Sequence, residues 1–318
     1  MSQTQPRGTT GTLDEFAPEL DLGADARPER LDPLGDPFFV IFAHPDDESF
    51  GCAGVMAIAS ERGVPITLIS ATRGEAGKTG IPELDTPEVL GAVREQELRA
   101  AAAAVGVGDV RFLDYRDSGM AGTPENDDPR SLHQAPETDV VAKLVPHLRA
   151  VRPATVISFG PDGIYGHPDH LAMHRAAVAA VHAAADPGYL PAVGEPWQIR
   201  ALYFNATPRE RLMLFAEMPD GPFRDLTPEQ LRKIGTPRAE ITTVIDTSQA
   251  RDAKLRAITA HRTQVGEGGP LANRPPEQLE MMLTREHFVR VALPWDDASA
   301  PVDDLIATLA AVSPVDPA

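Results

Sequence analysis

The feature that most constrains this chain is an uninterrupted apolar run that ends at charged residues. Phe38-Phe39-Val40-Ile41-Phe42 is followed by Ala43-His44-Pro45-Asp46-Asp47-Glu48. Such a run predicts a buried strand, and the residues after it mark the carboxyl end, where open α/β sheets hold their active sites. A histidine beside two carboxylates can supply two metal ligands and one free base. The corner therefore predicts a βα unit with metal-ligand chemistry.

Downstream, strand and helix patterns alternate. We expect strands at residues 38–43, 65–71, 110–113, 154–159, 199–204 and 241–245, and helices at 49–62, 86–106, 137–149, 168–185 and 248–262. The alternation predicts an α/β fold: a Rossmann-like, doubly wound, mostly parallel sheet of five or six strands, with a less regular C-terminal part. No Gly-x-Gly-x-x-Gly follows the first strand, which disfavours dinucleotide binding.

The ends of the chain differ from its middle in composition. Residues 1–36 are rich in Pro, Gly, Asp and Glu, which predicts a disordered or loosely attached tail. The folded domain is expected over residues 37–294. Residues 295–318 are acidic and punctuated by proline, and they predict a peripheral segment with one short helix at 302–312.

Charge and cysteine content limit the partners and the location. The net charge of -18, from 47 Asp and Glu against 29 Lys and Arg, argues against nucleic acid and against an anionic membrane surface. No apolar stretch approaches the roughly 20 residues of a membrane span. Cys52 is the single cysteine, and the N-terminus lacks the layout of a signal peptide. We expect a cytoplasmic protein; a homo-oligomer remains open.

A second polar cluster, Gly166-His167-Pro168-Asp169-His170, follows the strand expected at 154–159 and opens a helix. Either His-Pro-Asp tripeptide alone could be a loop in which Asp caps a helix. Two of them at the ends of two strands of one sheet favour a shared site.

A hydrolytic zinc centre needs three protein ligands and an open position. His44, Asp47 and His170 can supply them, which leaves Asp46 as the natural general base. His167 can stabilise an oxyanion or protonate a leaving amine if neighbouring acids hold it cationic. His174, four residues after His170, competes for the place of third ligand.

These residues resemble the PIG-L / LmbE-like N-acetylglucosaminyl deacetylases, which include the deacetylases of mycothiol and bacillithiol biosynthesis. The likeness extends in order through four further segments: Arg73-Gly74-Glu75-Ala76-Gly77, Arg94-Glu95-x-Glu97-Leu98, Asp114-Tyr115-Arg116-Asp117-Ser118-Gly119-Met120 and His261-Arg262-Thr263-Gln264. It spans about residues 38–264, within the domain expected at 37–294.

The resemblance implies roles for individual residues. It implies zinc on His44, Asp47 and His170, with Asp46 as general base and His167 beside the oxyanion. By the same likeness, Arg94 and Asp117 hold sugar hydroxyls, Tyr165 leans over the amide carbonyl and Glu75 lies at the rim of the metal site.

We therefore expect a zinc-dependent hydrolase that removes acetyl from an N-acetylglucosamine conjugate, a small-molecule substrate, with water as nucleophile. Iron(II) or cobalt(II) could take the place of zinc. An amidase acting on another small amide, such as a thiol S-conjugate or an antibiotic precursor, and a non-catalytic sugar-binding module remain alternatives. The Gly- and Pro-marked loops at 118–133 and 265–278 could be lids or substrate walls.

Overall fold

A computed structural model describes residues 37–84, 86–216, 223, 226–266, 275–296, 306 and 309. Its strands form one sheet in the order β3-β2-β1-β4-β5-β7-β6. The strands are β1 Phe38–Phe42, β2 Ile66–Ser70, β3 Asp109–Phe112, β4 Thr155–Phe159, β5 Ala201–Ala206, β6 Thr243–Asp246 and β7 Arg285–Val291. Strands β1 to β5 are parallel, whereas β7 runs antiparallel to both of its neighbours, β5 and β6. The mostly parallel α/β class is confirmed.

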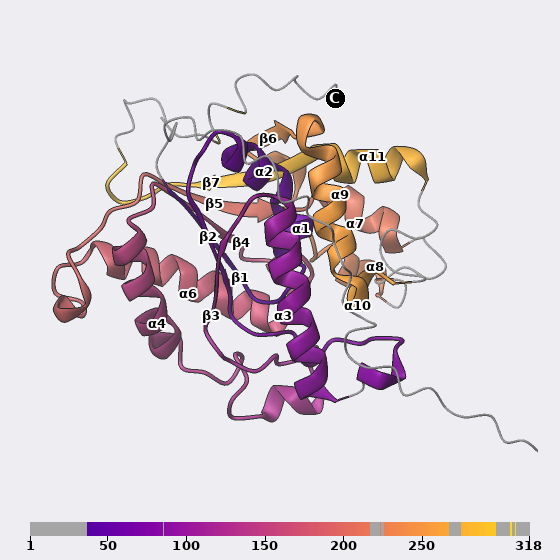
Figure 1. Cartoon of the computed structure of the whole chain (residues 1–318), viewed down its shortest axis with the longest axis horizontal. Coiled ribbons are helices and arrows are strands. Elements are labelled where there is room, and N and C mark those ends of the chain that lie inside the picture. The colour runs from indigo at the N-terminus through magenta and orange to yellow at the C-terminus, as the bar shows by residue number, and fades with distance from the viewer. Residues whose placement is uncertain are drawn as a thin grey trace, which may run out of the picture. The chain divides into compact units, whose positions relative to one another are not determined.

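Helices cover the sheet. They are α1 Asp47–Gly51, α2 Ala53–Glu61, α3 Pro87–Ala104, α4 Glu137–Val151, α5 Gly163–Gly166, α6 Pro168–Ala185, α7 Arg209–Ala216, α8 Pro228–Leu231, α9 Arg251–Ala260, α10 Arg262–Val265 and α11 Pro276–Thr284. Helix α4 packs against α6, and α3 packs against α9 (Figure 1). Every residue of β1, β2 and β4 is buried, as expected for central parallel strands covered on both faces.

The strand order changes direction at β1. From β1 the chain proceeds outward through β2 and β3, and then returns to β4 on the other side of β1. In open α/β sheets, ligands bind at such a switch point, beyond the carboxyl ends of the two strands. His44 follows β1 and His167 follows β4, so both polar clusters emerge at this crevice.

Some element boundaries differ from the sequence-based expectation. The helix expected at 49–62 is broken at Cys52, whose φ of −150° and ψ of 19° are not helical. The helix expected at 248–262 becomes a short 3-10 turn, Ser248–Ala250, followed by α9 and α10. The helix beginning at Thr86 forms as expected, because the Thr86 side chain accepts a hydrogen bond from the backbone of Val89.

The described part of the chain has seven strands rather than five or six. Strand β7 was not expected, because Arg285, Glu286, His287 and Arg290 give it a polar sequence. Its buried members are Glu286 and Phe288. Buried Glu286 pairs with Lys254 of α9, whose Nζ lies 2.6 Å from Glu286 Oε1. The sequence of the strand does not indicate this partner.

Several expectations fall on residues that the structure does not describe. The tail at 1–36 lies outside the described residues. So does the helix expected at 302–312, apart from Ile306 and Leu309, which are helical and buried. The loop at 265–278 is described at its two ends only. The division into tail, domain and peripheral segment therefore stays a prediction.

Candidate metal centre and active site

The corner after β1 is held by backbone contacts to β2 and by an unusual backbone conformation. The Ala43 carbonyl accepts hydrogen bonds from the Thr72 amide at 2.9 Å and from the Thr72 hydroxyl at 3.0 Å. Asp46 then adopts φ 109°, in the left-handed region that disfavours a side chain other than that of glycine. Strain of this kind persists only where the surroundings enforce it, and it is frequent at active sites.

Three residues with potential ligand atoms converge between the ends of β1 and β4. His44 Nδ1 lies 3.2 Å from His170 Nε2, and Asp47 places Oδ1 3.2 Å from His170 Nε2 and Oδ2 3.5 Å from His44 Nδ1. Ligands about 2.0–2.2 Å from a tetrahedral ion lie roughly 3.3–3.6 Å from one another. The separations fit one small cation.

The second nitrogen of each histidine has a partner that orients the ring. His170 Nδ1 lies 3.1 Å from the Gly163 carbonyl, which leaves Nε2 free to bind a metal. His44 Nε2 lies 3.0 Å from Asp169 Oδ2 and 3.4 Å from Asp117 Oδ1. Metal-bound histidines usually donate their other N–H to a carboxylate or a carbonyl. Both rings fit this pattern: His44 Nδ1 and His170 Nε2 face Asp47, and the other nitrogen of each ring faces its oxygen partner.

Other groupings of ligands are close enough to be considered. His44, His167 and His170 can bring one atom each within 4.8 Å of one another, and so can His44, Asp117 and Asp169. His167 uses Nδ1 to accept a hydrogen bond from the Asp169 amide at 3.2 Å. Asp169 accepts hydrogen bonds from the amide and hydroxyl of Ser118. These contacts favour His167 and Asp169 as supporting groups.

The electrostatics of the cluster favour a positive charge. Burial lowers the pKa of His44, but Asp117 and neighbouring carboxylates raise it by more, to well above its usual value. Burial raises the pKa of Asp47, but His170 and His44 bring it well below the usual range. A site that stabilises imidazolium cations in this way can also stabilise a metal ion.

His167 differs from the sequence-based expectation in its charge. Its pKa is lowered to about 2, mainly by burial and then by the charges of His44 and His170, which together outweigh the opposing effect of Asp117 and Asp47. It is therefore neutral at pH 7. Because Nδ1 accepts the Asp169 amide hydrogen, the ring hydrogen is on Nε2, and His167 can act as a neutral donor.

Asp46 lies beside the cluster with a pKa suited to accept a proton. The pKa of Asp46 is raised to about 6, because burial and the charge of Asp47 raise it by more than Arg94 lowers it. Arg94 Nη2 donates to Asp46 Oδ2 at 3.2 Å, and the Asp46 side chain is 22% exposed toward the pocket. A general base works best with a pKa near the working pH.

The expected substrate-binding residues are placed as supports in this structure. Arg94 is buried, and its guanidinium donates to the backbone carbonyls of Gly74 and Pro45 as well as to Asp46. Asp117 is buried and accepts from the amides of Gly119 and Ala76.

Glu75 also serves as a support, since it accepts from the Asp117 amide at 3.2 Å. In this structure Arg94 therefore contacts the corner, Asp117 contacts His44, and Glu75 contacts Asp117. Direct binding of sugar hydroxyls by these residues stays a prediction.

The two remaining candidates, Tyr165 and His174, lie in different surroundings. Tyr165 lines the pocket with Asp46 and Asp47, and burial followed by the charge of Asp47 raises its pKa, so its hydroxyl stays protonated. His174 lies one turn beyond His170 on α6, with Nδ1 2.9 Å from the Phe159 carbonyl. That contact turns His174 Nδ1 toward the backbone of β4.

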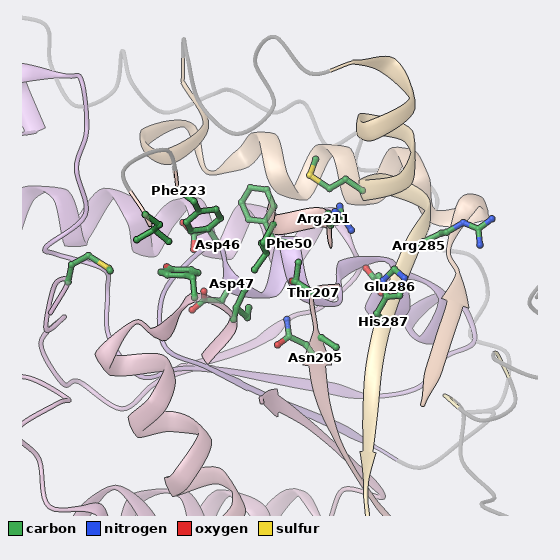
Figure 2. Close-up of a pocket in the computed structure, with 18 residues that line it drawn as sticks. Asp46, Asp47, Phe50, Asn205, Thr207, Arg211, Phe223, Arg285, Glu286 and His287 are labelled. Atoms are coloured by element: carbon green, nitrogen blue, oxygen red, sulfur yellow. The ribbon is translucent and has the colours of Figure 1, made fainter. Parts of the chain in front are cut away.

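A pocket of about 480 Å³ opens from the candidate metal centre. Figure 2 shows Asp46 and Asp47 at one end and Arg285 and His287 toward the other. Asn205 and Thr207, at the carboxyl end of β5, line its middle. Sequence reasoning missed them, although a polar residue at a strand end was the available signal.

Apolar side chains form much of the remaining pocket wall. Phe50, Leu212 and Phe223 are among them, and Met120 from the loop at 118–133 also lines the pocket. This loop therefore reaches the pocket through Met120, and its role as a lid or substrate wall stays a prediction.

An α/β fold with residues that could hold a metal ion at its switch point, and with a carboxylate beside them, is the arrangement expected of the class of metal-dependent hydrolases. The family profile described as "PIG-L: GlcNAc-PI de-N-acetylase" matches residues 39–181. The chain belongs to the PIG-L family, whose members are N-deacetylases, as the resemblance implied.

Relatives over most of the chain support this membership. A protein of Geodermatophilus obscurus named 1D-myo-inositol 2-acetamido-2-deoxy-alpha-D-glucopyranoside deacetylase is 37% identical, with 85% of this chain and 97% of that protein covered. A Frankia alni protein named as deacetylase 2 for the same compound is 40% identical, with 72% and 84% covered. The N,N'-diacetylchitobiose deacetylase structure from Pyrococcus horikoshii has a TM-score of 0.56, 19% identity, and 83% and 87% coverage. That structural likeness shows the fold alone.

Proposed function

We propose that this chain hydrolyses the 2-acetamido group of an N-acetylglucosamine conjugate to give acetate and a free amine. The observation that carries the proposal is the pairing of Asp46 with the convergent atoms of His44, Asp47 and His170 at one end of a pocket. The names of the two bacterial relatives support an inositol-linked N-acetylglucosamine as the first substrate to assay.

We propose zinc as the metal, held by His44, Asp47 and His170. One carboxylate and two imidazoles suit zinc, although iron(II) and cobalt(II) accept the same donors. When bound, the metal supplies Lewis-acid activation of water and of the amide carbonyl. The remaining chemistry belongs to the side chains around it.

Asp46 acts as the general base in this proposal. With a pKa of about 6 it is mostly ionised at pH 7, so it can take a proton from the attacking water. The same carboxyl then holds the proton that the leaving nitrogen requires. Asp46 faces the pocket, and Arg94 fixes one of its oxygens.

His167 and Tyr165 are proposed to stabilise the oxygen of the tetrahedral intermediate. Both are neutral donors, because burial lowers the pKa of His167 and raises that of Tyr165. Donors already in place cost no reorganisation when the oxyanion forms. Arg94, Asp117 and Glu75 remain proposed sugar-binding residues, and their contacts support the alternative that they hold the catalytic groups in place.

The apolar wall at Phe50, Leu212 and Phe223 favours a second candidate function. An amide whose distant part is apolar would bury more surface there than an inositol would. We keep as this alternative an amidase acting on such a substrate with the same catalytic groups.

Metal analysis combined with acetate release tests both candidates. The purified protein is assayed with inositol-linked N-acetylglucosamine, with N-acetylglucosamine alone and with an N-acetylglucosamine bearing an apolar aglycone. The proposal expects bound metal and the highest kcat/KM for the inositol conjugate. Preference for the apolar conjugate selects the alternative, and absence of acetate release from all three contradicts both.

The proposed location is the cytoplasm, based on the acidic charge and the single cysteine. Among the described residues, no helix is long and apolar enough to cross a bilayer. Cell fractionation tests the location, and sedimentation of the purified chain tests whether it forms a homo-oligomer.

A further inference from the structure

The segment His261-Arg262-Thr263-Gln264 has been given no role so far. His261 lies at the break between α9 and α10, 213 residues beyond Glu48, and its side chain is fully buried. It does not line the pocket. Its Nδ1 has no hydrogen-bond partner among the described residues, so its polar contacts are made through Nε2.

His261 Nε2 is linked to the backbone of the proposed base through one carboxylate. It lies 2.8 Å from Glu48 Oε1. The other oxygen, Glu48 Oε2, accepts the Asp46 amide hydrogen at 3.0 Å. Glu48 is buried, so neither contact competes with bulk water. This two-step contact holds Asp46 where its backbone has φ 109°.

Helix α3 supports both ends of this contact chain. Arg94 reaches the Pro45 carbonyl and the Asp46 carboxylate. Glu97, three residues further along the same helix, accepts from the Thr263 amide at 2.9 Å and from the Thr263 hydroxyl at 2.6 Å. Residues three apart share a helix face, so one side of α3 fixes both the base and the turn that carries His261.

We propose that Glu48, His261 and Thr263 form a brace that positions Asp46 for proton transfer. This inference rests on the proposed function, because it needs Asp46 to be the base. None of the three touches the pocket, so they are positioning residues rather than catalytic ones. Without the brace, the strained corner can relax and withdraw the carboxylate from the attacking water, although the metal ligands remain.

Three variants of the full chain separate positioning from general stability. His261→Leu removes the imidazole donor to Glu48 Oε1 and leaves the Ser49 hydroxyl as a donor to that oxygen, and His261→Gln keeps an N–H at nearly the same place. Thr263→Val removes the hydroxyl that donates a hydrogen bond to Glu97. The two side chains have similar shapes, so this variant is expected to fold. Thr259→Ala, on the exposed side of α9, is the matched control. Each is measured for kcat, KM, bound metal, thermal unfolding and hydrogen exchange over residues 44–50.

The brace predicts a fall in kcat of roughly 10- to 100-fold in His261→Leu, since small misplacements of reacting groups cost that much. KM and metal content stay near those of the unmodified protein, and exchange at residues 44–50 increases. Thr263→Val shows a smaller change in the same direction, His261→Gln restores most of kcat, and Thr259→Ala changes nothing. In an Asp46→Ala background, His261→Leu costs no further activity.

Unchanged exchange and kcat in folded His261→Leu and Thr263→Val overturn the brace. An equal further loss from His261→Leu in the Asp46→Ala background also overturns it, because the residue then acts elsewhere. If the unmodified chain releases no acetate from any substrate, the proposed function fails first. Increased exchange in His261→Leu then shows that the contact exists without the catalytic purpose inferred for it.

Discussion

The two His-Pro-Asp tripeptides have the same residues, but their histidine and aspartate side chains face different partners. In the first, His44 faces the candidate metal and Asp46 faces the pocket, with its side chain 22% exposed. In the second, His167 is turned to the backbone and Asp169 is completely buried behind His44. Pro168 is the first residue of α6, so Asp169 lies in the first helical turn, whereas Asp46 precedes α1 in a left-handed conformation. Backbone conformation, rather than residue type, assigns the roles.

The difference also separates two carboxyl groups chemically. Asp46, near Asp47 and partly open to the pocket, has a pKa near 6 and can exchange a proton. Asp169 receives hydrogen bonds from Ser118 and lies 3.0 Å from His44, so it is committed as an acceptor. The two tripeptides are identical as sequence motifs, but the proposed site uses the aspartate of one as a base and that of the other to orient His44.

The largest effect should come from removing the histidine that the second cluster contributes as a ligand. His170→Ala deletes one of three ligands, so we expect metal affinity to fall by more than about 100-fold and turnover to reach background. Isothermal titration with zinc and acetate release measure the two. His182→Ala, on the exposed part of the same helix, is the control and should leave both unchanged. Normal metal content in His170→Ala would exclude it as a ligand.

The second largest effect should distinguish His167 from its neighbour. His167→Ala removes the neutral donor proposed to stabilise the developing charge, which should lower kcat by roughly 10²- to 10³-fold. Metal content should be unchanged, because the contacts of His167 place it as a support. Zinc stoichiometry measured beside kcat checks this. If His167→Ala loses metal as His170→Ala does, the histidine trio including His167 is the real ligand set.

A smaller loss is expected at the buried carboxylate. Asp169→Asn presents an amide where His44 Nε2–H needs an acceptor, so metal affinity should fall by about 10- to 100-fold. At saturating zinc, kcat should recover most of its value. Competition with a chelator gives the affinity. A variant with unchanged affinity would show that Asp169 does not orient His44.

The mildest test concerns pH. Asp46 must be ionised to accept a proton, so kcat/KM should fall as pH drops through about 6 and level off above it. Arg94 lowers the pKa of Asp46, and Arg94→Gln should therefore move this acid limb to higher pH. A pH profile of both proteins measures the shift. An unmoved limb would mean that another group controls it.

The sequence was sufficient for the central sheet and for the convergence of the two clusters. Strand β1 is a continuous apolar run, β2 and β4 are mostly apolar, and parallel order brings their carboxyl ends together. The sequence was insufficient where the role of a side chain depends on a partner far away along the chain. The contact of Glu48 with His261 joins residues 213 positions apart.

Two further features needed the tertiary structure. Arg94 points to Pro45 and Asp46 rather than outward, and no local pattern sets that direction. The expectation that neighbouring acids favour a cationic His167 counted those acids but not its burial or the charges of His44 and His170, and these lower its pKa.

Asp46 and Asp47 are adjacent carboxylates with different proposed roles, and measuring both separates base from ligand. Asp46→Asn and Asp47→Asn are purified in parallel, and bound metal per chain and kcat for acetate release are determined on the same samples. Asp46→Asn should keep its metal and lose roughly 10²- to 10⁴-fold in kcat, whereas Asp47→Asn should lose the metal. Full metal and near-normal turnover in both variants, or metal loss in Asp46→Asn alone, would contradict the division of roles at this corner.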